Sequence, residues 1–198
     1  MRKKRPLDRE ATPVRDASLV VIASEDKYAV KQYFDFFEST KIQFRVLETS
    51  DGKSAPEYVH ERISEYIREF EIGEGDTLWV VCDCDHWVQP GHIQNPTHVI
   101  QECRKKHIEV ALSNPCFDLW LLLHFADFPE EEKLTCDEVA TQLRTAVGGY
   151  DKKKVYNLAI DDEKVSSAVK RARDNPRPRM GIPIRPQTER LSRNSRRS

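Results

Sequence analysis

The stretch Thr77–Asp85 reads TLWVVCDCD and decides the expected fold. Its first part, Thr77–Cys82, is almost continuously apolar, which is typical of a strand covered on both faces. Similar runs predict strands at Leu19–Ala23, Ile42–Leu47 and Ile108–Leu112, of which the second alternates as an edge strand would. Because segments with helical periodicity separate these runs, the sequence predicts an α/β protein with a parallel sheet of about four strands.

Helices are expected between the strands and after the last one. Asn114 and Pro115 are predicted to open one of them as N-cap and first-turn residue. The expected helical segments lie around Tyr33–Phe37, Val59–Phe70, Thr97–Lys106, Phe117–Phe125, Cys136–Val147 and Ile160–Arg173.

Charge is distributed unevenly along the chain. Residues 170–198 contain ten Lys or Arg against two acidic residues, a net charge of +8, and residues 1–16 carry +3, which leaves about −12 for residues 17–169. A cationic tail on an acidic body suits a protein that holds a polyanion with the tail and cations with the body. The alternative is a disordered tail that only adds solubility.

Four parts of the chain are predicted from these patterns. They are a basic N-terminal extension (1–17), an α/β domain (18–128), a helical C-terminal part (129–174) and a basic tail expected to be disordered (175–198). No apolar stretch approaches the roughly 20 residues that cross a bilayer, and the basic start lacks the apolar core of a signal peptide. Five cysteines, an odd number, are expected to be reduced thiols. The predicted localisation is cytoplasmic.

Carboxylates follow two of the predicted strands. Asp83 and Asp85 alternate with Cys82 and Cys84, so the two aspartates share one face. Glu25 follows the first strand and would reach the same sheet edge if the first and third strands are neighbours. Three carboxylates there predict a Mg²⁺ site that polarises a phosphoryl oxygen. The alternatives are that the aspartates only begin a polar turn, and that Glu25 only favours the start of a helix.

Two other kinds of site fit the sequence less well. Cys82, Cys84, His86 and His92 resemble a zinc cluster, but no second cysteine pair completes a tetrahedral set. Gly148–Gly149 lacks the sequence context of a phosphate-binding loop, so nucleotide hydrolysis is expected from a partner.

The order of these features resembles a known domain. In this chain, Glu25 follows one strand, and Asp83–Asp85 follows a later one. This order is similar to that of the Toprim domain of topoisomerases, primases and OLD-type nucleases. More narrowly, Ser113–Phe125 (SNPCFDLWLLLHF) resembles the RloB family of bacterial defence proteins, also called AbiLii-like. The resemblance covers roughly Ser18–Phe128, and more loosely the helices to about Arg173.

The chain departs from the family pattern at several positions. The first family motif resembles EGEKTEPNYF, whereas this chain has EDKYAVKQYF. Asp26 stands in place of glycine, Lys27 and Val30 in place of later acidic residues, and Asp118 in place of glutamate. The family's customary ending is not recognisable beyond Asn175.

The resemblance implies a Mg²⁺- or Mn²⁺-dependent nuclease that cleaves RNA, such as tRNA, or DNA, as an effector of anti-phage defence by abortive infection. It also implies an ATPase partner encoded beside it. The implied metal ligands are Glu25, Asp83 and Asp85. The implied catalytic residues are these three with Asp118 and His124, and Lys27 and Asn114 are the implied phosphate-binding residues.

Other functions stay open on the sequence alone. The main alternative is a non-catalytic nucleic-acid-binding or regulatory subunit of an ATPase-containing complex, and the altered first motif favours it. Another is an active site that works only after release from the ATPase. Asn114 has the simpler role of a helix start, and His124 that of complementing a helix dipole. A homo-oligomer is compatible with any of these.

Overall fold

The computed structural model describes residues 17–37, 39–49, 55–84, 96–129 and 134–174. This part of the chain contains a sheet of four strands in the order β2-β1-β3-β4. The strands are β1 (Ser18–Ser24), β2 (Ile42–Leu47), β3 (Thr77–Asp83) and β4 (Glu109–Ser113), and each neighbouring pair is parallel. The prediction of a parallel α/β sheet is confirmed.

The two most apolar strands lie at the centre of the sheet, as expected of strands covered on both faces. In β1, Val20–Ser24 pairs with Thr77–Val81 of β3. Strand β2 is an edge strand, and its first residue, Ile42, is 43% exposed. Because β1 and β3 are parallel neighbours, the residues that follow them meet at one edge of the sheet.

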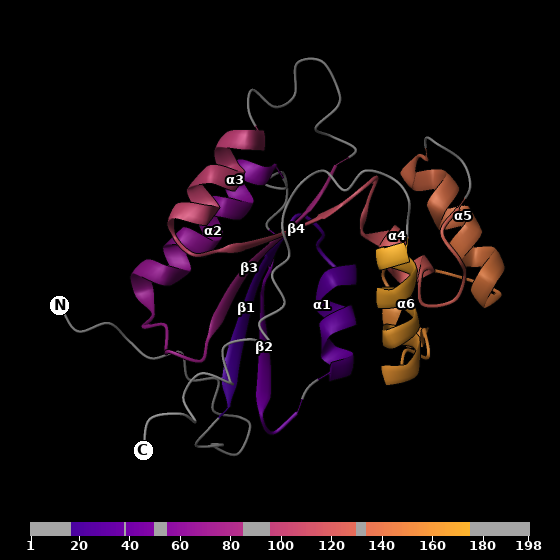
Figure 1. The fold of residues 1–198 in the computed structure, drawn as a ribbon, viewed down its shortest axis with the longest axis horizontal. Helices are drawn as coiled ribbons and strands as arrows, with labels where there is room; N and C mark the ends of the chain where they lie inside the picture. The colour runs from indigo at the N-terminus through magenta and orange to yellow at the C-terminus, as the bar shows by residue number, and fades with distance from the viewer. Residues whose placement is uncertain (1–16, 38, 50–54, 85–95, 130–133, 175–198) are drawn as a thin grey trace.

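Helices cover both faces of the sheet (Figure 1). On one face lie α2 (Pro56–Glu69) and α3 (Pro96–Lys105), and on the other lie α1 (Ala29–Phe34), followed by a short 3-10 turn, and α4 (Phe117–Leu122). We call these the α2/α3 face and the α1/α4 face.

Each face has its own hydrophobic core, because alternate strand residues point to opposite faces. On the α2/α3 face, Val21 and Val80 are buried with Ile63 of α2. On the α1/α4 face, Ile22 and Val81 are buried with residues of α1 and α4. Each Å² of apolar surface removed from water stabilises the fold by roughly 25 cal/mol. Burial on both faces is therefore the main stabilisation of the sheet.

Helix α4 begins later than the sequence predicts. Its N-cap is Cys116, whereas Asn114 is exposed and joined to Pro115 by a cis peptide bond. The carbonyls of Ser113 and Pro115 both accept hydrogen bonds from the backbone N–H of Cys84, at 2.8 and 3.0 Å. These bonds tie the segment to the end of β3, so the prediction that Asn114 is the N-cap is wrong.

The C-terminal part is helical, as predicted. It consists of α5 (Cys136–Val147), a 3-10 turn η3 (Val155–Asn157) and α6 (Asp162–Asp174). Val139 and Leu143 of α5 are fully buried in the core of the α1/α4 face. The helical part therefore packs on the side of the sheet that carries α4 (Figure 1).

The boundaries of α5 follow from local chemistry. Thr135 and Glu138 form a capping box in which each side chain bonds the other's backbone N–H. Gly148 ends the helix with a φ of 75°, a left-handed conformation that glycine adopts without steric cost.

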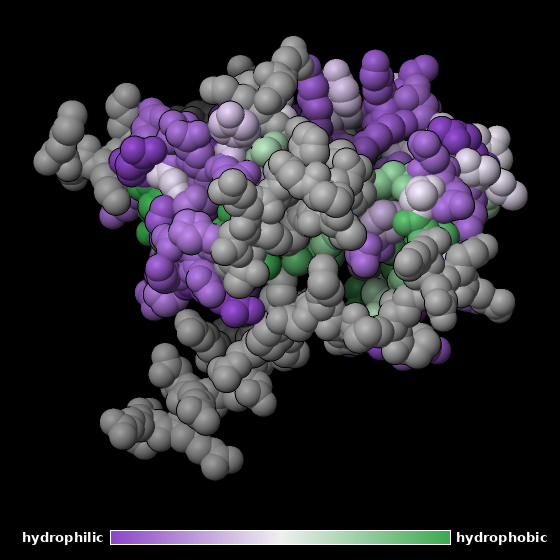
Figure 2. Space-filling view, turned by 90° about the horizontal axis from the view of Figure 1, so that it is seen from above, coloured by the Kyte–Doolittle hydropathy of each residue, from purple (hydrophilic) through white to green (hydrophobic). Residues whose placement is uncertain are grey.

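The predicted extension up to residue 16, the tail 175–198 and Asp85 lie outside the described residues. All five cysteines lie within them and are free thiols. The described helices include none with the length and apolar character needed to span a membrane. Viewed from above, hydrophilic side chains dominate the described surface over α2 and α3 and over α5 (Figure 2).

Candidate active site

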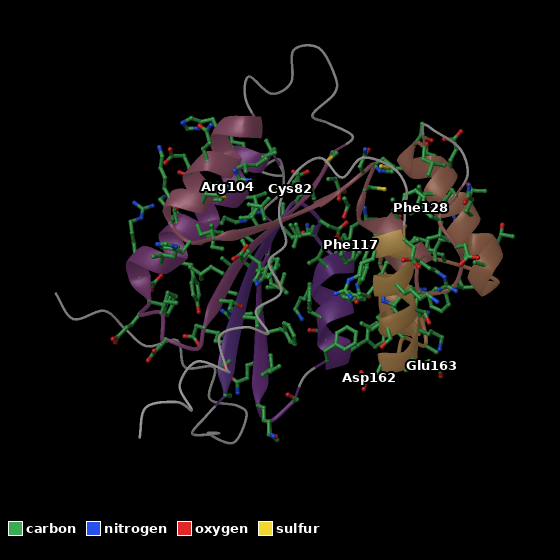
Figure 3. The ribbon with its side chains drawn as sticks, viewed as in Figure 1. Cys82, Arg104, Phe117, Phe128, Asp162 and Glu163 are labelled. Atoms are coloured by element: carbon green, nitrogen blue, oxygen red, sulfur yellow. The ribbon has the colours of Figure 1, made fainter. Side chains whose placement is uncertain are left out.

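Two of the predicted carboxylates reach the same edge of the sheet but lie on opposite faces. Asp83 ends β3, and its Oδ1 accepts a 2.9 Å hydrogen bond from the backbone N–H of Phe117 on the α1/α4 face. The Glu25 carboxylate accepts a hydrogen bond from the thiol of Cys82, which belongs to the core of the α2/α3 face. Cys82 and Phe117 mark these two sides in Figure 3. The alternation predicted for Asp83 and Cys82 is thus observed.

On the α1/α4 face, the negative charges of three aspartates act on one lysine. Lys152 Nζ lies 2.8 Å from Oδ2 of Asp26. Burial alone would lower the pKa of Lys152, but the negative charges of Asp26, Asp118 and Asp83 outweigh it and raise that pKa above its ordinary value. We call Asp26, Asp83, Asp118 and Lys152 the acidic cluster. Its lysine stays charged across the physiological range and balances part of the negative charge.

Asp118 is the most deeply buried carboxylate of the acidic cluster. It is 4% exposed, and its Oδ1 accepts a 2.7 Å hydrogen bond from the hydroxyl of Tyr150. Burial raises the pKa of Asp118, although the bond from Tyr150 and the charge of Lys152 act in the opposite direction. Burial and the neighbouring Asp118 likewise raise the pKa of Tyr150. This carboxyl is therefore easier to protonate than a solvated one.

Asp26 joins the acidic cluster to helix α1. Its Oδ1 accepts hydrogen bonds from the backbone N–H groups of Tyr28, at 2.7 Å, and Ala29. Its own backbone N–H donates to Ser24 Oγ at 3.0 Å. The aspartate thus satisfies donors at the start of α1, in the way that N-cap residues do, while its other oxygen faces Lys152.

Sequence reasoning missed three residues of this arrangement: Asp26, Tyr150 and Lys152. Asp26 carried a weak signal, because an aspartate a few residues before a helix can accept from the N–H groups at its start. Tyr150 and Lys152 carried none, since more than one hundred residues separate Lys152 from Asp26 and only tertiary packing brings them together.

The surroundings of Glu25 on the α2/α3 face are held by Arg62 and Thr49. Arg62 Nη2 donates to the carbonyl of Ser24 at 2.6 Å and to Thr49 Oγ1 at 3.0 Å. Thr49 Oγ1 donates to the same carbonyl at 2.5 Å. These bonds fix the end of β1 directly before Glu25. The pKa of Cys82 is raised mainly by burial and next by the charge of Glu25, so this thiol is protonated.

His124 lies in an aromatic core and joins α4 to α1. It is 3% exposed, its Nδ1 donates to the carbonyl of Trp120 at 2.8 Å, and its Nε2 lies 3.2 Å from the hydroxyl of Tyr33. Burial lowers the pKa of His124 and raises that of Tyr33 to about 12. A neutral imidazole therefore accepts from the Tyr33 hydroxyl. These bonds engage both ring nitrogens, and neither bond is to the acidic cluster.

The two predicted phosphate-binding residues lie at the surface. Asn114 is exposed in the loop between β4 and α4, next to the end of β3. Lys27 is also exposed, and its Nζ lies 5.7 Å from the centroid of the Tyr28 ring.

The described donors of the acidic cluster suit a divalent metal by their chemistry. The carboxylate oxygens of Asp26, Asp83 and Asp118 are ligands of the type that Mg²⁺ prefers, and their negative charges all act on Lys152. Within the described ranges, no three acidic, histidine or cysteine side chains are gathered closely enough to hold an ion. The donors fit Mg²⁺ by chemistry, and Asp85, the third predicted ligand, lies outside those ranges.

Fold and cluster together define a parallel α/β protein with an acidic site at the carboxyl edge of its sheet. The family model described as RloB-like protein matches residues 20–181, and the chain belongs to this family. The comparisons found no match among curated proteins or solved structures. The resemblance seen in Ser113–Phe125 is confirmed.

Proposed function

We propose that this chain is a divalent-metal-dependent nuclease that cleaves phosphodiester bonds in RNA, such as tRNA, or in DNA. The observation that carries the proposal is the acidic cluster, in which the charges of Asp83 and two further aspartates act on one lysine at the carboxyl edge of a parallel sheet. This edge is where ligands bind in open α/β sheets. Membership of the RloB-like family supports a role in anti-phage defence with an ATPase partner.

The proposed roles follow from chemistry and position. Asp83, with Asp85, would hold Mg²⁺ or Mn²⁺, which when bound supplies Lewis acidity to a phosphoryl oxygen. Glu25 has its neighbours on the opposite face and stands outside this ligand set. Asp118 is suited to proton transfer because burial raises its pKa. The Lys152 ammonium is suited to hold a negatively charged phosphate oxygen.

The remaining predicted residues have supporting roles in this proposal. His124 orients α4 against α1 through Tyr33, so that Asp118 and the start of α1 keep their places. Lys27 and Asn114, both exposed, contact phosphates of the bound strand.

A second candidate is a non-catalytic binding or regulatory subunit. The 2.8 Å ion pair between Lys152 and Asp26 favours it, because a protein cation already balances part of the charge that a metal would balance. A site that stays silent until an ATPase partner releases it is a variant of the first proposal. Assays with and without that partner separate the two.

The test is isothermal titration of Mg²⁺ and Mn²⁺ into the full chain and its Asp83→Ala/Asp85→Ala variant, followed by cleavage of pooled tRNA and plasmid. Glu61→Ala is the matched control, because it removes an exposed carboxylate of α2. The proposal expects metal binding and cleavage in the parent and control, and loss of both in the double variant. Absence of metal binding in all three proteins would favour the non-catalytic subunit.

A further inference from the structure

A second surface, next to the acidic cluster, combines exposed aromatic rings with lysines. Tyr28, at the start of α1, is 39% exposed. Two ammonium groups lie near its ring, with Lys27 Nζ at 5.7 Å and Lys153 Nζ at 5.8 Å from the ring centroid. Cations at such distances are attracted to the ring and hold it in place while part of it stays open to solvent.

A second tyrosine belongs to the same surface. Gln32 of α1 donates from Nε2 to the carbonyl of Lys153 at 3.1 Å, and its Oε1 accepts from the backbone N–H of Tyr156 at 3.4 Å. The segment 151–156 is thereby attached to α1 on the side of Tyr28. Tyr156 is 59% exposed, more than any other large hydrophobic side chain in the described part of the chain. We call Tyr28, Lys27, Lys153 and Tyr156 the tyrosine–lysine surface.

Charge and position connect this surface to the acidic cluster. Residues 26–32 and 151–156 together contain five lysines and two aspartates. Lys152, which pairs with Asp26 in the acidic cluster, directly precedes Lys153. A strand lying on the tyrosine–lysine surface would therefore have its phosphates next to basic groups and close to the acidic cluster.

We propose that the tyrosine–lysine surface binds single-stranded nucleic acid, with bases stacked on Tyr28 and Tyr156 and phosphates held by Lys27 and Lys153. Exposed aromatic rings stack on the open faces of unpaired bases, whereas a duplex covers those faces. This inference rests on the proposed function and names its substrate class as an unpaired segment of RNA or DNA.

The experiment measures fluorescence anisotropy of a labelled 20-nucleotide oligo-U and of a labelled duplex of the same length with the full chain. EDTA is present, so that binding is observed without metal-dependent cleavage. The variants are Tyr28→Ala and Tyr156→Ala. Tyr58→Ala is the matched control, because Tyr58 is a similarly exposed tyrosine (41%) on α2.

The expected result is at least tenfold tighter binding of the single strand than of the duplex. Each tyrosine variant should weaken single-strand binding by about fivefold or more, as removal of a stacking ring does, and Tyr58→Ala should not. Tyr28→Phe should retain the affinity because it keeps the ring. Unchanged affinity in both alanine variants, or equal affinity for the duplex, would overturn the inference.

Two further measurements distinguish this inference from a surface for an acidic protein and from the nuclease proposal. A poly-glutamate peptide that competes as well as oligo-U would show a surface for an acidic protein and overturn the stacking model. Asp83→Ala/Asp85→Ala should keep single-strand binding. If no protein cleaves nucleic acid but the tyrosine variants lose binding, the nuclease proposal fails and this inference stands; if the parent cleaves and the tyrosine variants bind normally, the reverse holds.

Discussion

The two faces of the sheet differ in how they balance charge at the carboxyl edge. On the α1/α4 face, Asp26, Asp83 and Asp118 act on one ammonium, which the segment after α5 supplies. On the α2/α3 face, Glu25 lies beside a buried thiol, and Arg62 bonds a backbone carbonyl and a threonine. The first face gathers three carboxylates whose charges act on one lysine, whereas on the second a single carboxylate, Glu25, acts on Arg62, which also fixes the end of a strand. We therefore propose that the chemistry takes place where the helical part meets the sheet.

The largest expected effect on stability comes from removing the shared cation. Lys152→Met removes the ammonium group from beside two buried carboxylates. They are Asp26, whose side chain is 6% exposed, and Asp118, which is 4% exposed. Because the lysine side chain itself is 44% exposed, solvent screens part of the effect, and we expect a loss of about 2 kcal/mol in the free energy of unfolding. Urea denaturation measures it.

The matched control for this change is Lys154→Met. Lys154 is exposed and lies 4.0 Å from Asp151, also exposed, so its removal should change the free energy of unfolding by less than about 0.5 kcal/mol. An equal loss in both variants would contradict the special role of Lys152.

The pH dependence of His124 offers a second test. Burial lowers its pKa below the ordinary 6.5, so the unfolded chain binds this proton more readily than the folded one. Stability should therefore be fully present above pH 6.5 and fall as the pH drops below it, by up to about 1.4 kcal/mol per pH unit. His124→Gln should flatten this slope in urea titrations, and an unchanged slope in this variant would contradict the burial of a neutral imidazole.

Asp118 should produce a slope of the opposite sign. Its pKa is raised above the ordinary 3.8, so the folded chain holds this proton more tightly than the unfolded one. Stability from this group is lost as the pH rises from 3.8 through the raised pKa, by at most about 1.4 kcal/mol per pH unit. In Asp118→Asn, whose amide oxygen still accepts from Tyr150, that loss should vanish. An unchanged pH profile would argue against deep burial of this carboxyl.

The smallest expected effect concerns the α2/α3 face. Thr49→Val removes the hydroxyl that bonds the carbonyl of Ser24 and accepts from Arg62, and should cost about 1 kcal/mol in the free energy of unfolding. Thermal denaturation measures it. Thr145→Val is the control, because the exposed hydroxyl of Thr145 bonds only within α5. Similar losses in both would mean that the bonds of Thr49 do not fix the strand end.

Local pattern was enough to predict most of the fold. The range predicted for β2, Ile42–Leu47, and that predicted for α5, Cys136–Val147, agree with the structure, because hydrophobic periodicity reports which residues are buried. The start of α4 was predicted wrongly, since Asn-Pro is a good helix opening locally but here the carbonyls around it bond Cys84 of another segment.

The candidate site was predictable only in part. The strand order brings Glu25 and Asp83 to one edge of the sheet, as expected. Their contacts, with Cys82 and with Phe117, show that they lie on different faces. Lys152 and Tyr150 were not predictable, because nothing in their local sequence indicates that they contact Asp26 and Asp118. The hydrophobic pattern of the sequence locates the ends of the strands. The residues that contact a buried charged side chain depend instead on tertiary packing.

The most direct test of the central claim is the rate at which the chain cleaves a labelled single-stranded RNA in Mg²⁺, measured for the parent, Asp83→Asn and Glu61→Gln. The asparagine oxygen can still accept from the backbone N–H of Phe117, so the start of α4 is preserved. We predict cleavage by the parent and by Glu61→Gln, and at least a hundredfold lower rate, on the order of 3 kcal/mol, for Asp83→Asn. Cleavage by Asp83→Asn at the parental rate would contradict an active site in the acidic cluster.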